Sequence, residues 1–163
     1  MELTFAPKNH LQIDEAFIPF SNFAGRGDEY NREGDRNFAI TIPTQEMADA
    51  LTDAGWNVTI RQPKNPGDEP FMFLKVKLRF DVYPPIIYLN SNGNLRKLDE
   101  NSVGLLDAID FERVDMDIRA YNWTYGGRSG RTAYLEKLHV VQKVDRFAAR
   151  YAPGVDSEDR LPI

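Results

Sequence analysis

The residues best suited to chemistry form a row of aromatic and basic side chains late in the sequence. Four of them stand two residues apart and two more arginines follow: Arg119, Tyr121, Trp123, Tyr125, Arg128 and Arg131. A spacing of two places side chains on one face of a β-strand. Aromatic rings can stack on the bases of single-stranded nucleic acid while guanidinium groups contact its phosphates. The same rings could instead cover a second core layer or join two protein surfaces.

A second basic row lies earlier in the chain. Lys75, Lys77 and Arg79 are also spaced by two, and apolar residues from Met72 to Phe80 fill the positions between them. Such a row can follow a phosphate backbone. Strands also carry lysine simply to keep a face solvated or to prevent edge pairing. The second row therefore supports nucleic-acid binding mainly in combination with the first.

Residues for catalysis are harder to find. Asp115 and Asp117 share a strand face, as two ligands of a divalent metal would, and this permits a nuclease hypothesis. No further converging carboxylate or histidine is identifiable, and Arg113 and Arg119 could pair with the two aspartates. The sequence has no cysteine, no phosphate-binding loop motif and no nucleophile elbow. We therefore predict a binding protein without catalytic residues, cofactor or metal site.

Long strands are needed to hold these rows. Alternation of apolar and polar residues predicts one strand over 71–82 and another over 112–125. The glycine-rich segment 126–131 predicts a turn, after which 132–143 returns as the second strand of a hairpin. Tyr134 on the returning strand joins the candidate stacking residues.

The rest of the chain reads as short strands with few helices. Further strands are predicted over 15–23, 37–42, 56–60 and 86–89, and helices over 45–54, 101–108 and 145–151. Thr44 is a good N-cap for the main helix, and Gly55 ends it. Short strands separated by turns, with one good helix among them, favour a small barrel. The predicted fold class is mainly β (β-rich α+β): an OB-like five-stranded barrel with one main helix, an extended hairpin and short accessory helices.

Length and composition set the remaining limits. A chain of 163 residues, 42% hydrophobic and 28% charged, has the make-up of one globular domain. It shows neither a transmembrane segment nor a signal peptide, which predicts a cytoplasmic protein. The net charge of −5 argues against coating duplex DNA through overall positive charge, but it permits a local basic groove.

The sequence ends in a short acidic stretch with an apolar tip. We expect residues 1–152 to form the domain and residues 153–163 an acidic C-terminal tail. Free ends of this kind often have no function. Acidic residues followed by apolar ones can also dock on partner proteins. The candidate partner-binding residues are Asp156, Glu158, Asp159, Leu161, Pro162 and Ile163.

Several segments form a recognisable pattern: Tyr30–Phe38, Gly55–Val58, Val114–Ile118, and Tyr121–Trp123 together with Gly130 and Ala133–Leu135. This pattern resembles a group of small phage-type proteins that bind single-stranded DNA on an OB-like fold, and the similarity runs from about Phe17 to Tyr151. The tail resembles the acidic tip of bacterial single-stranded DNA-binding proteins, which recruits replication and repair proteins. Here Arg160 interrupts the acids and Ile163 replaces the terminal aromatic residue.

Residues and resemblance together predict sequence-tolerant binding of single-stranded DNA in phage or mobile-element DNA replication or recombination, in the host cell cytoplasm. The tail would contact replication or recombination proteins, and the protein could form a homo-oligomer. The main alternative is a phage structural or protein-interaction module whose aromatic face is an oligomer interface, and a metal-dependent nuclease is a third hypothesis. The predicted DNA-binding residues are Lys75, Lys77, Arg79, Arg119, Tyr121, Trp123, Tyr125, Arg128, Arg131 and Tyr134.

Overall fold

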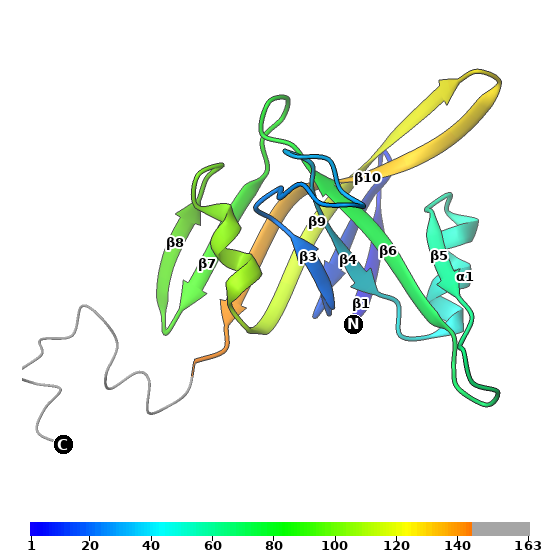
Figure 1. The fold of residues 1–163 in the computed structure, drawn as a ribbon, viewed down its shortest axis with the longest axis horizontal. Helices are drawn as coiled ribbons and strands as arrows, with labels where there is room; N and C mark the ends of the chain where they lie inside the picture. Colours follow the sequence, from blue (N-terminus) through cyan, green and yellow to red (C-terminus); the bar gives the residue numbers. More distant parts are fainter. Residues whose placement is uncertain (145–163) are drawn as a thin grey trace, which may run out of the picture.

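The computed structural model describes residues 1–144 (Figure 1). Within that range it contains ten strands, one α-helix and one 3-10 helix, which confirms the mainly β class. The strands are β1 (Glu2–Ala6), β2 (His10–Asp14), β3 (Phe20–Asn22), β4 (Arg36–Thr41), β5 (Val58–Arg61), β6 (Phe71–Leu78), β7 (Ile86–Ser91), β8 (Asn94–Leu98), β9 (Phe111–Tyr125) and β10 (Arg128–Gln142). The helices are α1 (Gln45–Asp53) and η1 (Val103–Ala108).

The two longest strands, β9 and β10, form the centre of a single sheet. The strand order is β1-β2-β9-β10-β6-β4-β3, with β5 on β6, β7 on β10 and β8 on β7. Most neighbours are antiparallel, but β10 runs parallel to β6 and to β7. The order ends at β1 on one side and at β3 on the other, so the sheet is open. In the described residues it therefore has more strands than the predicted five-stranded barrel and does not close.

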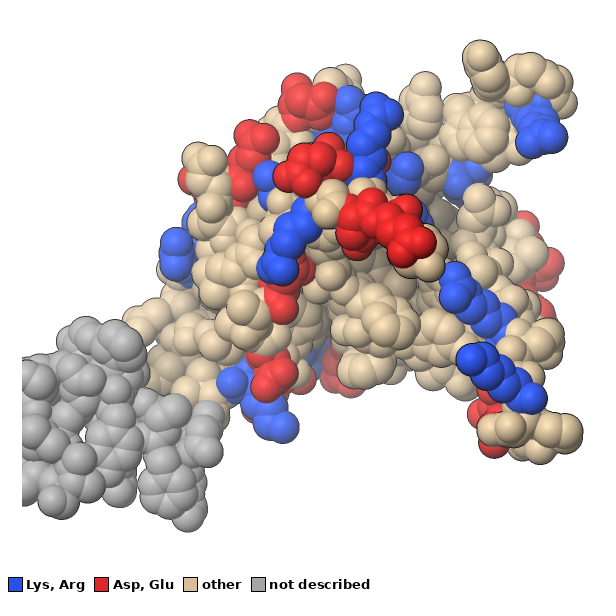
Figure 2. Space-filling model, viewed as in Figure 1, with Lys and Arg blue, Asp and Glu red and all other residues tan. Residues whose placement is uncertain are grey.

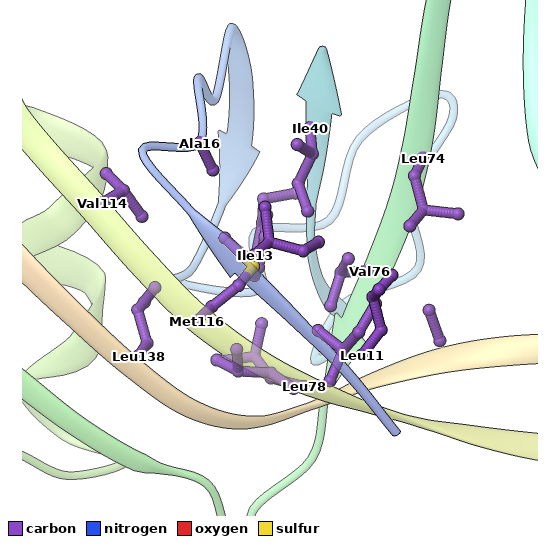
Figure 3. Close-up of a cluster of buried hydrophobic side chains, with 14 of the residues drawn as sticks. Leu11, Ile13, Ala16, Ile40, Leu74, Val76, Leu78, Val114, Met116 and Leu138 are labelled. Carbon is purple, nitrogen blue, oxygen red and sulfur yellow. The ribbon is translucent and has the colours of Figure 1, made fainter. Parts of the chain in front are cut away.

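The core follows from alternation along these strands. Every second residue of β6, from Met72 to Leu78, is buried, and so are alternate residues of β9 from Val114 to Ile118. Figure 3 shows these side chains meeting those of β2, including Leu11 and Ile13. Because successive strand residues point to opposite faces, the intervening polar residues must face away from the core. Within residues 1–144 the sheet thus has one apolar face and one face that carries the polar residues.

Helix α1 begins and ends where the sequence predicts. The Thr44 hydroxyl accepts a hydrogen bond from the Met47 N–H at 3.2 Å, which satisfies one of the free donors of the first turn. Ala48 and Leu51 are buried, so the helix packs one face against the sheet. Gly55 has φ +96°, the left-handed conformation that ends a helix most easily in glycine.

The β9–β10 hairpin extends beyond the body of the molecule (Figure 1). Gly126 and Gly127 form its turn with φ of 58° and 78°, the positive values that a two-residue hairpin turn requires. Pairing resumes at once between Tyr125 and Arg128. The prediction of a six-residue turn over 126–131 is therefore wrong, because the two glycines suffice and Arg128 already belongs to β10.

Some elements differ from the sequence prediction. The strands β1, β2 and β8 are not predicted, and the strand expected over 15–23 shrinks to β3. The expected helix over 101–108 is a 3-10 helix that starts at Val103, where Asp99 accepts hydrogen bonds from the preceding backbone. The helix predicted over 145–151 and the tail over 153–163 lie outside the described residues.

Candidate nucleic-acid interface

The two basic rows face the same side of the sheet. Paired residues of neighbouring strands point to the same face, and one chain of pairs crosses the sheet from β4 to β2. It joins Asn37 to Lys77, Lys77 to Tyr134, Tyr134 to Arg119, and Arg119 to His10. The strand carrying Lys75 and Lys77 and the strand carrying the aromatic row therefore contribute to one continuous outward surface, which we call the outer face.

Tyr134 and Arg119 form the centre of this face. The Arg119 guanidinium lies over the Tyr134 ring at 5.0 Å and over the Tyr83 ring at 5.4 Å. The Tyr121 ring meets Tyr134 edge-on, with 6.3 Å between the ring centroids. Cation–π contacts of this kind hold a guanidinium in place while leaving its N–H groups free to donate. The centre of the face thus presents oriented rings together with a fixed positive charge.

Arg79 lies beside this centre but is partly engaged by an acid. Its guanidinium contacts the Asp81 carboxylate at 2.6 Å. Hydrogen bonding to Asp81, and then to Tyr134, raises the pKa of Arg79, and the same ion pair lowers the pKa of Asp81. Both side chains are exposed, so the pair can exchange partners with a phosphate at small cost.

The end of the hairpin presents its rings to solvent. Tyr121 is 54% exposed, Trp123 37% and Tyr125 85%. The Trp123 indole lies over Gly130 on the opposite strand, where a Cβ at Gly130 would clash with the ring. Figure 2 shows basic side chains without acidic neighbours near this end of the molecule. The hairpin therefore offers ring faces and positive charge together.

A cleft lies between the outer end of β6 and the loop before β4. It encloses about 560 Å³ and is lined by both acidic and basic residues, among them Lys75, Lys77 and Tyr134. Asn31 organises the loop: its side-chain amide donates to the carbonyls of Arg26 and Asp35. Figure 2 shows the mixture of charges over this part of the surface. The cleft can admit a phosphate backbone along its lysine side, while its acids restrict where that backbone lies.

Arg131 is held by groups outside the aromatic row, although it lines one pocket together with Lys75 and Lys77. Its guanidinium donates to the Ala54 carbonyl and to the Asn122 side chain, both at 2.8 Å, and lies over the Trp56 ring at 5.1 Å. It pairs with Asn122 on β9, on the face opposite to Tyr121 and Trp123. Arg131 thus ties the hairpin to the end of α1, whereas the sequence predicts that it contacts phosphate.

The two aspartates of the nuclease hypothesis have different surroundings. Although burial opposes it, hydrogen bonds from Arg113 and from the Glu15 N–H lower the pKa of Asp115. Burial raises the pKa of Asp117, and Lys137 partly offsets this. In residues 1–144 no three acidic, histidine or cysteine side chains are grouped to hold a metal ion. Asp115 is thus a structural ion-pair partner of Arg113.

Tyr83 contributes to the outer face, but the sequence does not reveal it. It is 75% exposed and has φ +52°, an uncommon backbone conformation for a bulky residue. It stands before Pro84 and Pro85, which indicates only a loop, and nothing in its spacing links it to the aromatic row. Its contact with Arg119 arises from tertiary structure alone.

The sequence of this chain matches the model of one protein family. The model of the family described as "Putative phage ssDNA-binding domain" matches residues 2–161. No curated protein sequence matches the chain significantly.

Similar solved structures include those of a single-stranded DNA-binding protein from bacteriophage Enc34. The single-stranded DNA-binding protein of bacteriophage Enc34 in complex with ssDNA superimposes with a TM-score of 0.58 at 10% identity, covering 88% of this chain and 92% of that one. Another structure of that protein has a TM-score of 0.55 at 12% identity and covers 98% of both chains. At such identity the likeness concerns the fold, and it confirms the predicted OB-like architecture.

Proposed function

Because this chain belongs to the family of phage single-stranded DNA-binding domains, we propose that its outer face binds single-stranded DNA with little dependence on base sequence. The observation that carries the proposal is the row of pairs linking Lys77, Tyr134 and Arg119 across three strands. Through this row the basic side chains of β6 and the exposed rings of the hairpin lie on one surface. The Enc34 protein, which shares the fold, has a solved structure in complex with ssDNA.

On this surface, aromatic rings and basic side chains are proposed to contact different parts of the DNA. Exposed rings such as Tyr121 and Trp123 can each stack on a base, at roughly 1–3 kcal/mol per base. Lysine and arginine side chains contact phosphates, so affinity falls as salt rises. Every base has a π-face, and stacking therefore tolerates any sequence. The local concentration of positive charge also reconciles DNA binding with the net charge of −5.

We assign the contact roles residue by residue. Tyr121, Trp123, Tyr125 and Tyr134 are proposed to stack. The phosphate contacts are proposed for Lys75, Lys77, Arg79, Arg119 and Arg128. Arg131 is proposed as a positioning residue, because its guanidinium is held by the Ala54 carbonyl and Asn122.

Membership of the family supports a proposal for the wider role. We propose that the protein acts in phage or mobile-element DNA replication or recombination, in the host cytoplasm, by binding without catalysis. In residues 1–144 no helix is long and apolar enough to cross a membrane. Residues 1–152 would form the DNA-binding domain and 153–163 a tail that contacts replication or recombination proteins through its acidic and apolar residues. Self-association through the aromatic face is the alternative use of the same residues.

Tryptophan fluorescence tests the proposed function. Trp56 is only 4% exposed, whereas Trp123 lies on the outer face. Addition of oligo-dT at low salt is expected to quench the emission of the wild-type protein. The variant Trp123→Ala is expected to lose most of that response, with Trp56 as a constant background.

Two results would contradict the proposal. One is the absence of binding below roughly 100 μM at low salt, since even nonspecific nucleic-acid contacts reach that range. The other is a change of oligomeric state on substitution of Trp123 with no effect of DNA, which would assign the rings to a protein interface. Sedimentation velocity of the wild-type protein and of the Trp123→Ala variant distinguishes these outcomes.

A further inference from the structure

A second aromatic cluster occupies the other end of β6. Phe71 and Phe73 stack on each other with 5.4 Å between centroids and 29° between planes. Phe20 of β3 meets Phe71 edge-on at 6.2 Å, and the Arg61 guanidinium of β5 lies over the Phe73 ring at 5.5 Å. We call Phe20, Phe71, Phe73 and Arg61 the Phe71 platform. It unites the neighbouring strands β5 and β6 with β3, which lies far from them in the sequence.

The Phe71 platform belongs to the outer face and not to the core. Met72 and Leu74, which alternate with its two β6 rings, are buried on the opposite side. Phe20 is 67% exposed, although phenylalanine has no polar group to gain from water. Clustered apolar rings that stay exposed mark interaction surfaces. A guanidinium over one of them favours a partner with negative charge as well as planar groups.

Lys75 and Lys77 connect this platform to the hairpin. Both point to the same side as Phe71 and Phe73, because all four alternate with buried residues. From Phe71 to Lys77 the strand advances by six residues, about 20 Å at roughly 3.3 Å per residue. Beyond Lys77 the pairing continues directly to Tyr134. Along this single surface, the rings of the Phe71 platform are therefore followed by the two lysines and then by the rings of the hairpin.

We propose that the Phe71 platform is a second stacking site for the same DNA strand that contacts the hairpin rings. This inference rests on the proposed function. One segment of the strand stacks at Tyr121, Trp123 and Tyr134, and its phosphates pass along Lys77 and Lys75. A second segment stacks on Phe20 and Phe71 beside Arg61.

Two sites on one strand produce a dependence on oligonucleotide length. A short oligonucleotide occupies one site at a time, whereas a longer one engages both, and the second contact forms at high effective concentration. OB-type domains contact about 4–16 nucleotides, which sets the lengths to compare. Loss of the Phe71 platform must therefore weaken the binding of long oligonucleotides much more than the binding of short ones.

The test uses the full chain and fluorescein-labelled oligo-dT of about 4 and about 12 nucleotides, lengths within the range of OB-type sites, at low salt. Phe20→Ala is the first variant, because its exposed ring can be removed with little effect on folding, and Phe71→Ala is the second. Anisotropy is expected to show a Kd for the long oligonucleotide that rises about tenfold, as for loss of one stacked base. The Kd for the short one should change by less than about twofold, the statistical loss of one of two sites.

Phe5→Ala is the matched control. Its ring is 47% exposed, but it lies on β1 and pairs with the buried residue Leu11, so it is on the other face of the sheet. This variant should bind both lengths like the wild type.

The outcomes separate the two proposals. If Phe20→Ala and Phe71→Ala bind the long oligonucleotide with the same Kd as the wild type, the second site is overturned while the proposed function stands. A shift in sedimentation coefficient without a change in Kd would also overturn the second site and would make the platform a contact between two copies. Absence of binding by the wild-type protein would instead refute the proposed function, and the second site with it.

Discussion

At the scale of residues, the outer face is organised around Arg119. Its guanidinium lies over two tyrosines that come from different parts of the chain, Tyr83 and Tyr134. Each contact restricts the arginine without neutralising it, so its charge remains available to a phosphate. Arg113, by contrast, is held by two carboxylates, those of Asp115 and Glu15. Two arginines of the same strand therefore have different roles, which their partners determine.

Lys77 gives a residue-scale prediction about salt. If Lys77 contacts one phosphate, Lys77→Gln should reduce the slope of log K against log salt for oligo-dT by about 0.7. Lys97→Gln is the matched control, because Lys97 is an exposed lysine on β8, a strand that pairs only with β7 and lies far from the hairpin (Figure 1). Anisotropy titrations at several salt concentrations measure both slopes. Equal slopes for wild type and Lys77→Gln would remove Lys77 from the phosphate path.

Asp115 gives a prediction about stability and pH. Its folded-state pKa lies below the ordinary value of 3.8, so its ionised form stabilises the fold above that pH, and the contribution is lost as the pH falls through the lowered pKa. Asp115→Asn should therefore reduce the free energy of unfolding by about 1 kcal/mol at neutral pH, a modest value for a partly exposed pair. The difference from wild type should shrink in acid.

Urea denaturation at about pH 7 and about pH 3, on either side of the ordinary carboxyl pKa, measures this effect. Asp117→Asn is the control, because burial raises the pKa of Asp117 and its charge does not favour folding at neutral pH. If Asp115→Asn lowers the free energy of unfolding by the same amount at both pH values, the charge of the Asp115 carboxylate does not stabilise the fold.

At the scale of elements, the hairpin is the main element of the proposed DNA-binding surface, and it projects from the body of the molecule. Beyond Ala120 its residues are exposed, and Arg131 connects it to the end of α1. The carbonyl that accepts this hydrogen bond belongs to Ala54, next to Gly55, and a Cβ at Gly55 would lie only 3.0 Å from the Arg131 guanidinium carbon. The end of the helix thus positions the rings without touching them.

Arg131→Ala tests this positioning role. Loss of a hydrogen-bonded guanidinium is expected to lower the free energy of unfolding by about 1–2 kcal/mol. Amide hydrogen exchange in the hairpin, residues 121–131, should become faster. Arg128→Ala is the contrasting variant: it should lower the salt slope of DNA binding and leave exchange unchanged. A lowered salt slope for Arg131→Ala with unchanged exchange would restore the phosphate role that the sequence predicts.

The elements also show what can be predicted from sequence alone. Alternation correctly predicts which residues of β6 and β9 face the core, because a period of two is a local property. Arg131 illustrates the limit, since its spacing indicates a charged turn but its partners Ala54 and Trp56 come from a distant segment. The Phe71 platform is hidden for the same reason: Phe20, Arg61 and Phe71 become neighbours only through strand pairing. Strand β8 escapes prediction because its residues Asn94–Lys97 are all exposed and carry no apolar alternation.

At the scale of the whole molecule, the open sheet separates two functions by face. One face builds the core from alternate residues of β2, β6 and β9 (Figure 3). The other presents rings and basic side chains from the Phe71 platform to the end of the hairpin. The long strand β9 contributes to both faces: its alternate residues up to Ile118 pack in the core, and its residues beyond Ala120 are exposed on the projecting hairpin that it forms with β10. A net acidic protein can therefore keep one face suited to DNA.

Chemical-shift mapping tests the central claim most directly. Oligo-dT is titrated into the ¹⁵N-labelled protein, and each backbone amide is followed. We expect the shifts to concentrate at Lys77, Arg119 and Tyr134, at the hairpin rings and at the Phe71 platform, while the amides of β1 and β8 stay unchanged. Shifts confined to β7 and β8, or an unaltered spectrum at saturating oligo-dT, would contradict the assignment of the outer face as the DNA-binding surface.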